Sequence, residues 1–322
     1  MRRTIFGTLL IVSGLESQLM AFGPGRVNSG ASSGVVAVTP TVRGGRVYQL
    51  AEGSDFQKGC FGFCLCPIIQ WGPVRGTFVL RFIGREGPYR VFAVEDVNWT
   101  VSVYQPPELR ITGSGTYRVS GGPVPTHRLE LDLAVGDLPV EHFDSGVVSG
   151  RGLPFISVTL SIHGMYCFDT VIEVMAAPVP REEIVDYGLA PETAFVRGCF
   201  EPCDCPSGEP QLVTGTFSLV ESWENSLFRE FAVVDVRWVV ASVPGFPPKT
   251  PISGFGIYRV GGEFAVQHQV SLDLRVGDEP LTHYDSGWVV GGSNFPDIDA
   301  LISIHGLFCF DTAIDIHATP AR

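Results

Sequence analysis

The ten residues THRLELDLAV, Thr126–Val135, decide the fold class of this chain. Every second residue from His127 to Leu133 lies in one row, in which three leucines follow the histidine, and the residues between them are charged. Successive side chains of a β-strand point to opposite faces of a sheet. This spacing therefore predicts a strand with one buried face and one solvent-exposed face.

The segments PFISVTLSIHG (154–164) and CFDTVIEV (167–174) show the same alternation. In the first, the row that ends at Ile162 is expected to face the core and the row that ends at His163 to face solvent. In the second, the row that begins at Phe168 is the expected core face. Six to eight such strands, separated by Gly/Pro turns, predict an antiparallel β-sandwich, for which immunoglobulin-like and jelly-roll topologies both fit.

The strand pattern occurs twice because the chain contains a duplicated domain. YQLAEGSDFQKGCFGFCLCP (48–67) aligns with YGLAPETAFVRGCFEPCDCP (187–206). The offset is 139 residues there and 142 residues between His163 and His305, so the copies differ by only a few loop residues. The sequence thus predicts an all-β protein of two tandem antiparallel β-sandwich domains related by internal duplication.

The N-terminus, MRRTIFGTLLIVSGLESQLMAFGPG, has two arginines before a short apolar run. This layout is typical of a secretory signal peptide, and the run is too short to span a bilayer. We expect a signal peptide over 1–21, a Gly/Ser-rich leader over 22–45, and sandwich repeats over 46–178 and 185–322. No later stretch has the length and apolar character of a membrane span.

Composition limits the classes of partner. The chain has 322 residues, of which 45% are hydrophobic and 17% charged, so it can bury a substantial core. Its formal net charge is −12, and no run of Lys or Arg follows the first residues. Phosphate binding needs clustered cations, so a nucleic-acid partner is not expected. No cofactor-binding motif is present, and none is predicted.

The eight cysteines divide equally between the copies: Cys60, Cys64, Cys66 and Cys167, then Cys199, Cys203, Cys205 and Cys309. A copy-matched, even set behind a signal-like segment predicts two disulfides in each domain. Either Cys60–Cys64 accompanies Cys66–Cys167, or Cys60–Cys66 accompanies Cys64–Cys167. The Cys-x3-Cys-x-Cys spacing is not usual for zinc, which prefers Cys-x2-Cys pairs.

A polar cluster recurs in SIHGMYCFDT (161–170) and SIHGLFCFDT (303–312). Its members are Ser161, His163, Asp169, Ser303, His305 and Asp311. A three-residue hairpin loop would set His163 opposite Cys167 and Ser161 opposite Asp169, all facing away from the core.

A catalytic triad is one interpretation of this cluster, but Ser161 is expected in mid-strand, without the G-x-S-x-G turn or an oxyanion hole. The preferred interpretation is structural. His163 and Asp169 are expected to hydrogen-bond the backbone of a cap closed by the Cys60–Cys66 disulfide, whose amides need partners. The sequence predicts no catalytic residue and no metal ligand set there, although an enzymatic role stays open.

Three further features each have a structural and a functional interpretation. His127 is expected to be a buried core histidine. His142 could bind a metal together with Asp144, although Asp-Ser-Gly more often forms a turn. The sequon NWT at Asn98 is absent from the second copy and would accept a glycan only in a eukaryotic host.

The leading functional hypothesis is a secreted, disulfide-stabilised tandem β-sandwich that acts in binding or adhesion or as an extracellular structural component. Its partner would be an extracellular protein or glycan, held by end loops that differ between the copies. Those loops are 83–90 against 221–229 and 106–110 against 244–251.

The alternative hypothesis is a metal-dependent enzyme or metal-binding protein that uses His163 and Cys167 together with His305 and Cys309.

Overall fold

The computed structural model describes residues 44–64, 66–68, 70–102, 108–150, 152–241, 249–291 and 295–321. The expected signal peptide and all but the end of the expected leader lie outside the described residues. No helix in the described part of the chain is long and apolar enough to cross a membrane.

The strands of the first repeat are, in chain order, β1 (Gly45–Leu50), β2 (Asp55–Phe61), β3 (Gln70–Glu86), β4 (Tyr89–Val101), β5 (Leu109–Ser120), β6 (Thr126–Val135), β7 (Glu141–Asp144), β8 (Val148–Ser149), β9 (Ile156–Ser161) and β10 (Cys167–Pro178). A 3-10 turn, η1 (Arg181–Glu183), joins the repeats.

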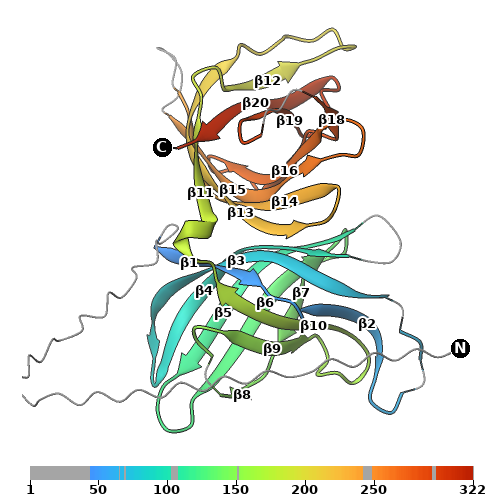
Figure 1. The fold of residues 1–322 in the computed structure, drawn as a ribbon, viewed down its shortest axis with the longest axis vertical. Helices are drawn as coiled ribbons and strands as arrows, with labels where there is room; N and C mark the ends of the chain where they lie inside the picture. Colours follow the sequence, from blue (N-terminus) through green and yellow to red (C-terminus); the bar gives the residue numbers. More distant parts are fainter. Residues whose placement is uncertain are drawn as a thin grey trace, which may run out of the picture. The chain divides into compact units, whose positions relative to one another are not determined.

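The second repeat matches the first strand for strand: β11 (Ile184–Leu189), β12 (Ala194–Cys199), β13 (Gln211–Glu224), β14 (Phe228–Val240), β15 (Thr250–Gly261), β16 (Gln267–Val276), β17 (Thr282–Asp285), β18 (Val289–Val290), β19 (Ile298–Ser303) and β20 (Phe310–Pro320). Figure 1 shows this order along the colour scale.

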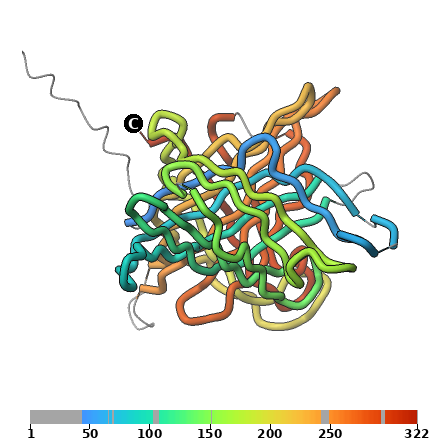
Figure 2. The backbone as a smooth tube through the Cα atoms, turned by 90° about the horizontal axis from the view of Figure 1, so that it is seen from below, coloured from blue at the N-terminus to red at the C-terminus, as the bar shows by residue number. Residues whose placement is uncertain are grey.

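Each repeat is one antiparallel sheet that closes on itself. Strands β3 to β7 pair in chain order, β7 pairs with β9, and β9 pairs with β10. β10 then pairs with β1 and β2, which lie end to end beside β3 and so complete the circuit. Figure 2 shows blue β2 running alongside light-green β10.

The predicted fold class is confirmed, since the described chain is nearly all β and each repeat is an antiparallel sheet wrapped around its own core, with a common strand plan, as expected for tandem β-sandwich domains. The topology differs from both of the connectivities considered from sequence. Neighbours in the sheet are mostly neighbours in the chain, so each repeat is a meander and not a Greek key. Alternating side chains report which face of a strand is buried, and they do not report which strand lies beside it.

The core contains the rows that alternation predicted. His127 and the leucines of β6 are buried, and so are the row from Ile156 to Leu160 and the two matched residues Trp99 and Trp238. The aromatic packing is also duplicated. The ring centroids of Phe78 and Trp99 are 6.0 Å apart, and those of the matched Phe217 and Trp238 are likewise 6.0 Å apart.

A third apolar cluster joins the two repeats. Its buried members are Val47, Val79, Val179, Ile184, Val220, Ala232 and Val234. The sequon residue Asn98 also lies here, because its amide Nδ2 donates to the carbonyl oxygen of Gly256 at 2.7 Å. Asn98 is buried and its amide is engaged, so a glycan on this side chain would not fit the contact between the repeats.

Four of the valines that form this contact are replaced by polar residues in the other copy. Strand pairing matches Val47 and Val79 of the first repeat to Asp186 and Ser218 of the second, and Ser218 Oγ donates to Asp186 at 2.7 Å. It likewise matches Val220 and Val234 of the second repeat to Arg81 and Glu95 of the first, which form an ion pair. At these four matched positions, valine therefore occurs in the copy whose position is part of the contact and a polar residue occurs in the other copy.

A buried ion-pair network lies beside this cluster. The carboxylate of Glu230, whose side chain is 2% exposed, accepts hydrogen bonds from Arg75 Nε at 2.9 Å and Arg259 Nε at 2.7 Å. Glu108, which belongs to the first repeat, forms ion pairs with the guanidinium groups of both Arg75 and Arg259. Burial alone would raise the pKa of Glu230. The bonds and charge of Arg75, with those of Arg259, outweigh burial and lower this pKa below its usual value.

We expect Glu230→Ala to lower the free energy of unfolding by about 3 kcal/mol, because it leaves two buried guanidinium groups with fewer counter-charges. Urea unfolding with the disulfides intact measures this change. Glu221→Ala is the control. It removes an exposed ion pair with Arg229 and should cost less than about 1 kcal/mol. Equal effects of the two substitutions would contradict a stabilising role for the network.

Candidate functional site

The disulfides follow the second of the two pairings considered from sequence. They are Cys60–Cys66, Cys64–Cys167, Cys199–Cys205 and Cys203–Cys309. The Cα atoms of the two long-range pairs are 5.1 Å and 4.9 Å apart, which is normal disulfide spacing. Strand pairing explains this proximity. Cys60 lies opposite Phe168, so the start of β10 is held beside the cysteine knot, as we call the segment 60–66 that the Cys60–Cys66 disulfide closes.

The same disulfides remove the cysteines from the alternative metal-site hypothesis. The sulfurs of Cys167 and Cys309 are each bonded to another sulfur, so they supply no thiolate ligand. In the described part of the chain, no three His, Cys, Asp or Glu residues converge as a metal site would require. His142 Nδ1 lies 2.8 Å from Asp132, whereas Asp144 is bound by Arg128.

The hairpin between β9 and β10 differs from the sequence prediction. Ser161 pairs with Val171 and not with Asp169, so the loop is longer than three residues. Met165 and Cys167 adopt left-handed backbone angles, with φ of 60° and 54°. These angles shift the alternation.

The expected orientations at this hairpin were therefore partly wrong. Ser161 and Asp169 are buried, although both were expected to face solvent. Phe168 is exposed, although it was expected to face the core. A left-handed residue turns the chain, so the two-residue period does not continue through Met165 and Cys167 to Phe168 and Asp169. Ser161 comes before these residues, and its hydroxyl accepts from the amide of Gly164 in the loop that follows it.

The buried carboxylate of Asp169 holds this loop together. Its Oδ1 accepts from the backbone amide of Thr170 at 2.7 Å, and its Oδ2 accepts from Met165 at 2.8 Å and from His163 at 3.1 Å. Asp311 makes the matching bonds in the second repeat, including 2.9 Å from the amide of Leu307. From the sequence, His163 and Asp169 were expected to bind backbone amides of the segment closed by the Cys60–Cys66 disulfide. The carboxylates instead bind the amides of their own loops.

The remaining members of the polar cluster lie close to these carboxylates. The rings of His163 and His305 are mostly exposed, with Nδ1 at 3.5 Å and 3.4 Å from Asp169 and Asp311. Ser161 Oγ accepts from the amide of Gly164 at 3.0 Å. Among the hydrogen bonds of the described residues, none joins Ser161 to His163. The serine–histidine hydrogen bond that a catalytic triad needs is therefore not formed.

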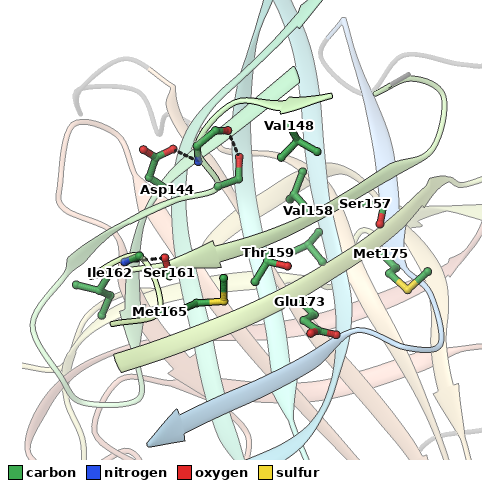
Figure 3. A pocket seen from close by; sticks show the side chains of 14 residues that line it. Asp144, Val148, Ser157, Val158, Thr159, Ser161, Ile162, Met165, Glu173 and Met175 are labelled. Atoms are coloured by element: carbon green, nitrogen blue, oxygen red, sulfur yellow. Dashed lines mark hydrogen bonds between the residues drawn. The ribbon is translucent and has the colours of Figure 1, made fainter. Parts of the chain in front are cut away.

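A groove of about 650 Å³ lies beside this loop in the first repeat. The turn 144–146 and Val148 form one wall, and the β9–β10 loop with Met165 forms another. Figure 3 shows Thr159 from β9 and Glu173 from β10 on the remaining side. Neither strand alternation nor a motif predicted this groove.

A matching groove of about 640 Å³ lies in the second repeat. The turn 285–287 and the loop residue Leu307 form its walls, and Leu301 takes the place of Thr159. The sequence does contain a signal for this pair of sites, because the segments DSG and SIHG that frame them are retained in both copies. The first had been interpreted only as a turn.

The two grooves share a frame but differ in chemistry. Strand pairing matches Ser157 and Met175 of the first repeat to Asp299 and His317 of the second. Nδ1 of His317 lies 2.8 Å from Asp299, and its Nε2 lies 3.4 Å from Asp315. Burial lowers the pKa of His317, but the bonds and charges of the two aspartates outweigh burial and raise it above its usual value.

The hairpins that sequence comparison nominated as binding loops are exposed. Strands β3 and β4 continue to Glu86 and Tyr89, so the segment 83–90 is the tip of a long hairpin, and Ile83 on it is half exposed. In the matched hairpin Leu227 is exposed. Residues 106–107 and 244–248 of the other two loops lie outside the described residues.

Comparison of this chain with protein-family models, with curated proteins and with solved structures finds no match. The grooves and their chemistry are therefore interpreted from this chain alone.

We expect Asp169→Asn to lower the free energy of unfolding by about 3 kcal/mol, since the amide loses the charge and turns an N–H group toward backbone donors. Asp311→Asn should have a similar effect on the second repeat. Urea unfolding and amide hydrogen exchange at Met165 measure the change. Asp132→Asn, at an exposed carboxylate, is the control and should cost less than about 1 kcal/mol. Unchanged exchange at Met165 in Asp169→Asn would refute the anchoring role.

The raised pKa of His317 gives a pH dependence of defined sign. The folded state binds the proton more tightly than the unfolded state, so this stabilisation is complete below about pH 6.5 and is lost as pH rises through the folded pKa. His317→Met introduces the residue found at the matched position of the first repeat. The stability difference between wild type and this variant should shrink from pH 6 to pH 8 (about two units spanning the usual pKa). A difference that grows with pH would contradict the assignment.

Proposed function

We propose that this protein is secreted and acts by binding, with its two matched grooves as the ligand sites. The observation that carries the proposal is the duplication of the groove. Two cavities of about 650 and 640 Å³ are framed by the same DSG turn and SIHG loop in both repeats. Surface positions elsewhere have diverged, so the retention of this frame supports a shared role.

The chemistry of the grooves favours binding over catalysis. Ser145 Oγ donates to the carbonyl of Gly146 and accepts from the amide of Leu129, so this hydroxyl holds a turn. The Ser161 hydroxyl is likewise engaged by the amide of Gly164. A nucleophile needs an adjacent base, and these hydroxyls bond backbone groups instead.

The disulfides support both the location and the rigidity of the sites. Four disulfides and an all-β fold suit an oxidising, extracellular environment, and the signal-like residues 1–21 support secretion. The Cys64–Cys167 bridge ties the cysteine knot to the end of the β9–β10 loop, and this loop forms one wall of the first groove. A wall held in place before binding loses little entropy when a ligand arrives.

The two grooves lie in one chain, so a ligand with repeated binding segments could engage both at once. Their linkage would raise the overall affinity above that of either groove without any new contact. Asp299 and His317 of the second repeat stand where the first repeat has Ser157 and Met175. The second groove would therefore favour charged ligand groups more than the first groove does. An extracellular protein or a glycan at a surface fits this mode of action.

A binding screen with groove-filled variants tests the proposal. Wild-type protein and the double variant T159W/L301W are labelled and applied to arrays of immobilised glycans, extracellular-matrix proteins and peptides. Wild type should be retained by at least one class. The double variant should lose that retention at least tenfold, because each indole fills its groove.

Val124→Trp is the matched control, since Val124 is exposed and lies outside both grooves. Retention that both tryptophan proteins keep equally would move the site away from the grooves. A failure of wild type on every class would reject the binding function.

A further inference from the structure

The closed sheet of each repeat has a gap at the same place. β9 pairs with β10 over the whole of Ile156–Ser161, but it pairs with β7 only through Ser161 and Asp144. In the second repeat β19 pairs with β20 over Ile298–Ser303, and with β17 only through Ser303 and Asp285. Each of the two strands therefore has one side that is open along most of its length, as far as the described residues extend.

The open side of β9 presents unpaired backbone groups. No backbone or side-chain hydrogen bond of the described residues reaches 156–160 apart from the ladder with β10. In an antiparallel pair, roughly half of the N–H and C=O groups of a strand point to each side, so the remaining groups face the gap. Such an edge is a template for another strand.

The groove coincides with this gap. Ser157, Val158 and Thr159 of the open strand line it in the first repeat, opposite the wall formed by the turn 144–146. Asp299 and Leu301 of β19 line its counterpart. A strand rises about 3.3 Å per residue, so an open edge of five residues accommodates an extended segment of about five residues.

The charge of the lining indicates which side chains such a segment would carry. Asp285, Asp299 and Asp315 line the second groove, and the one cationic group bonded to the last two is the titratable His317. In the first groove the ion pair with Arg128 neutralises Asp144, which leaves Glu173 as the exposed carboxylate.

Apolar side chains also contribute. Met165 and Met175 are exposed in the first groove, and Leu301 is exposed in the second. The lining therefore suits a segment that alternates basic and apolar residues, and the second groove carries more negative charge.

We propose that each groove binds an extended polypeptide segment of a partner protein, which adds as a strand to the open side of β9 or β19. Lysine or arginine at alternate positions of this segment contacts the carboxylates, and the second groove prefers basic segments more strongly. Main-chain hydrogen bonds supply affinity and side-chain contacts supply selectivity, as in other strand-addition complexes. This inference rests on the proposed function for the location of the site and adds the class of ligand.

The probe is the heptapeptide Val-Lys-Val-Lys-Val-Lys-Val with a fluorescent label, titrated with the intact protein and followed by anisotropy. Two isomers carry N-methyl groups on alternate amides, one on each edge of the extended peptide. An added strand uses one edge only. One isomer should therefore lose affinity at least tenfold and the other should bind within about threefold of the parent.

Amide hydrogen exchange on the wild-type protein locates the peptide without any substitution. Backbone amides in 156–160 and 298–302 should gain protection when the heptapeptide is added. In Thr159→Trp only the second of these segments should be protected, and in Leu301→Trp only the first, whereas Val124→Trp should behave as wild type. Asp315→Asn should weaken binding at the second groove about two- to fivefold, because it removes an ion pair.

Equal binding of both methylated isomers, or protection elsewhere than in these segments, would overturn strand addition. A second heptapeptide with glutamate in place of each lysine tests the charge preference, and equal binding of this peptide would overturn the preference for basic residues. The absence of binding by any peptide would overturn the inference as a whole. These failures are distinct from failure of the proposed function. A glycan or folded protein that is retained on the array and lost in T159W/L301W would preserve the grooves as binding sites while excluding an added strand.

Discussion

The bonds from one buried carboxylate in each repeat to its own loop determine the rest of the site. Asp169 and Asp311 each gather several backbone amides, which holds the chain in a long, irregular loop between two paired strands. That loop carries Cys167 or Cys309 to the cysteine knot and provides one wall of a groove. The groove itself opens on the other side of β9, where pairing with β7 is limited to Ser161 and Asp144.

Most of the architecture could be predicted from sequence because it depends on periodic burial and on duplication. The alternation in β6 identified the core row, and copy-matched cysteines identified four bridges with two pairings open. The register beyond Ser161 could not be predicted, because Met165 and Cys167 adopt left-handed angles that favour glycine. Alternation contains no information on such angles. The groove was missed because it lies where β7 and β9 pair at a single position, and a sequence pattern does not indicate which strands stay unpaired.

The duplication explains why two sites share a frame and why their linings differ. Framing residues determine backbone geometry, so changing them would disrupt the loop. Outward-facing residues of β9, β10, β19 and β20 have no such constraint. Ser157 and Asp299 occupy matched positions, as do Met175 and His317. The network at Glu230 also lacks a copy, since Val91 occupies the matched position. Comparing the copies therefore could not reveal it.

The contact between the repeats joins different faces of the same fold, and contacts of that kind can continue without limit into a filament. The second repeat has Asp186 and Ser218 where the first has Val47 and Val79, and the first has Arg81 and Glu95 where the second has Val220 and Val234. Stacking a second copy of this chain in the same way would bring the Asp186–Ser218 pair against the Arg81–Glu95 ion pair and would take both out of water, which costs free energy. These polar pairs therefore disfavour end-to-end association of copies of this chain into filaments.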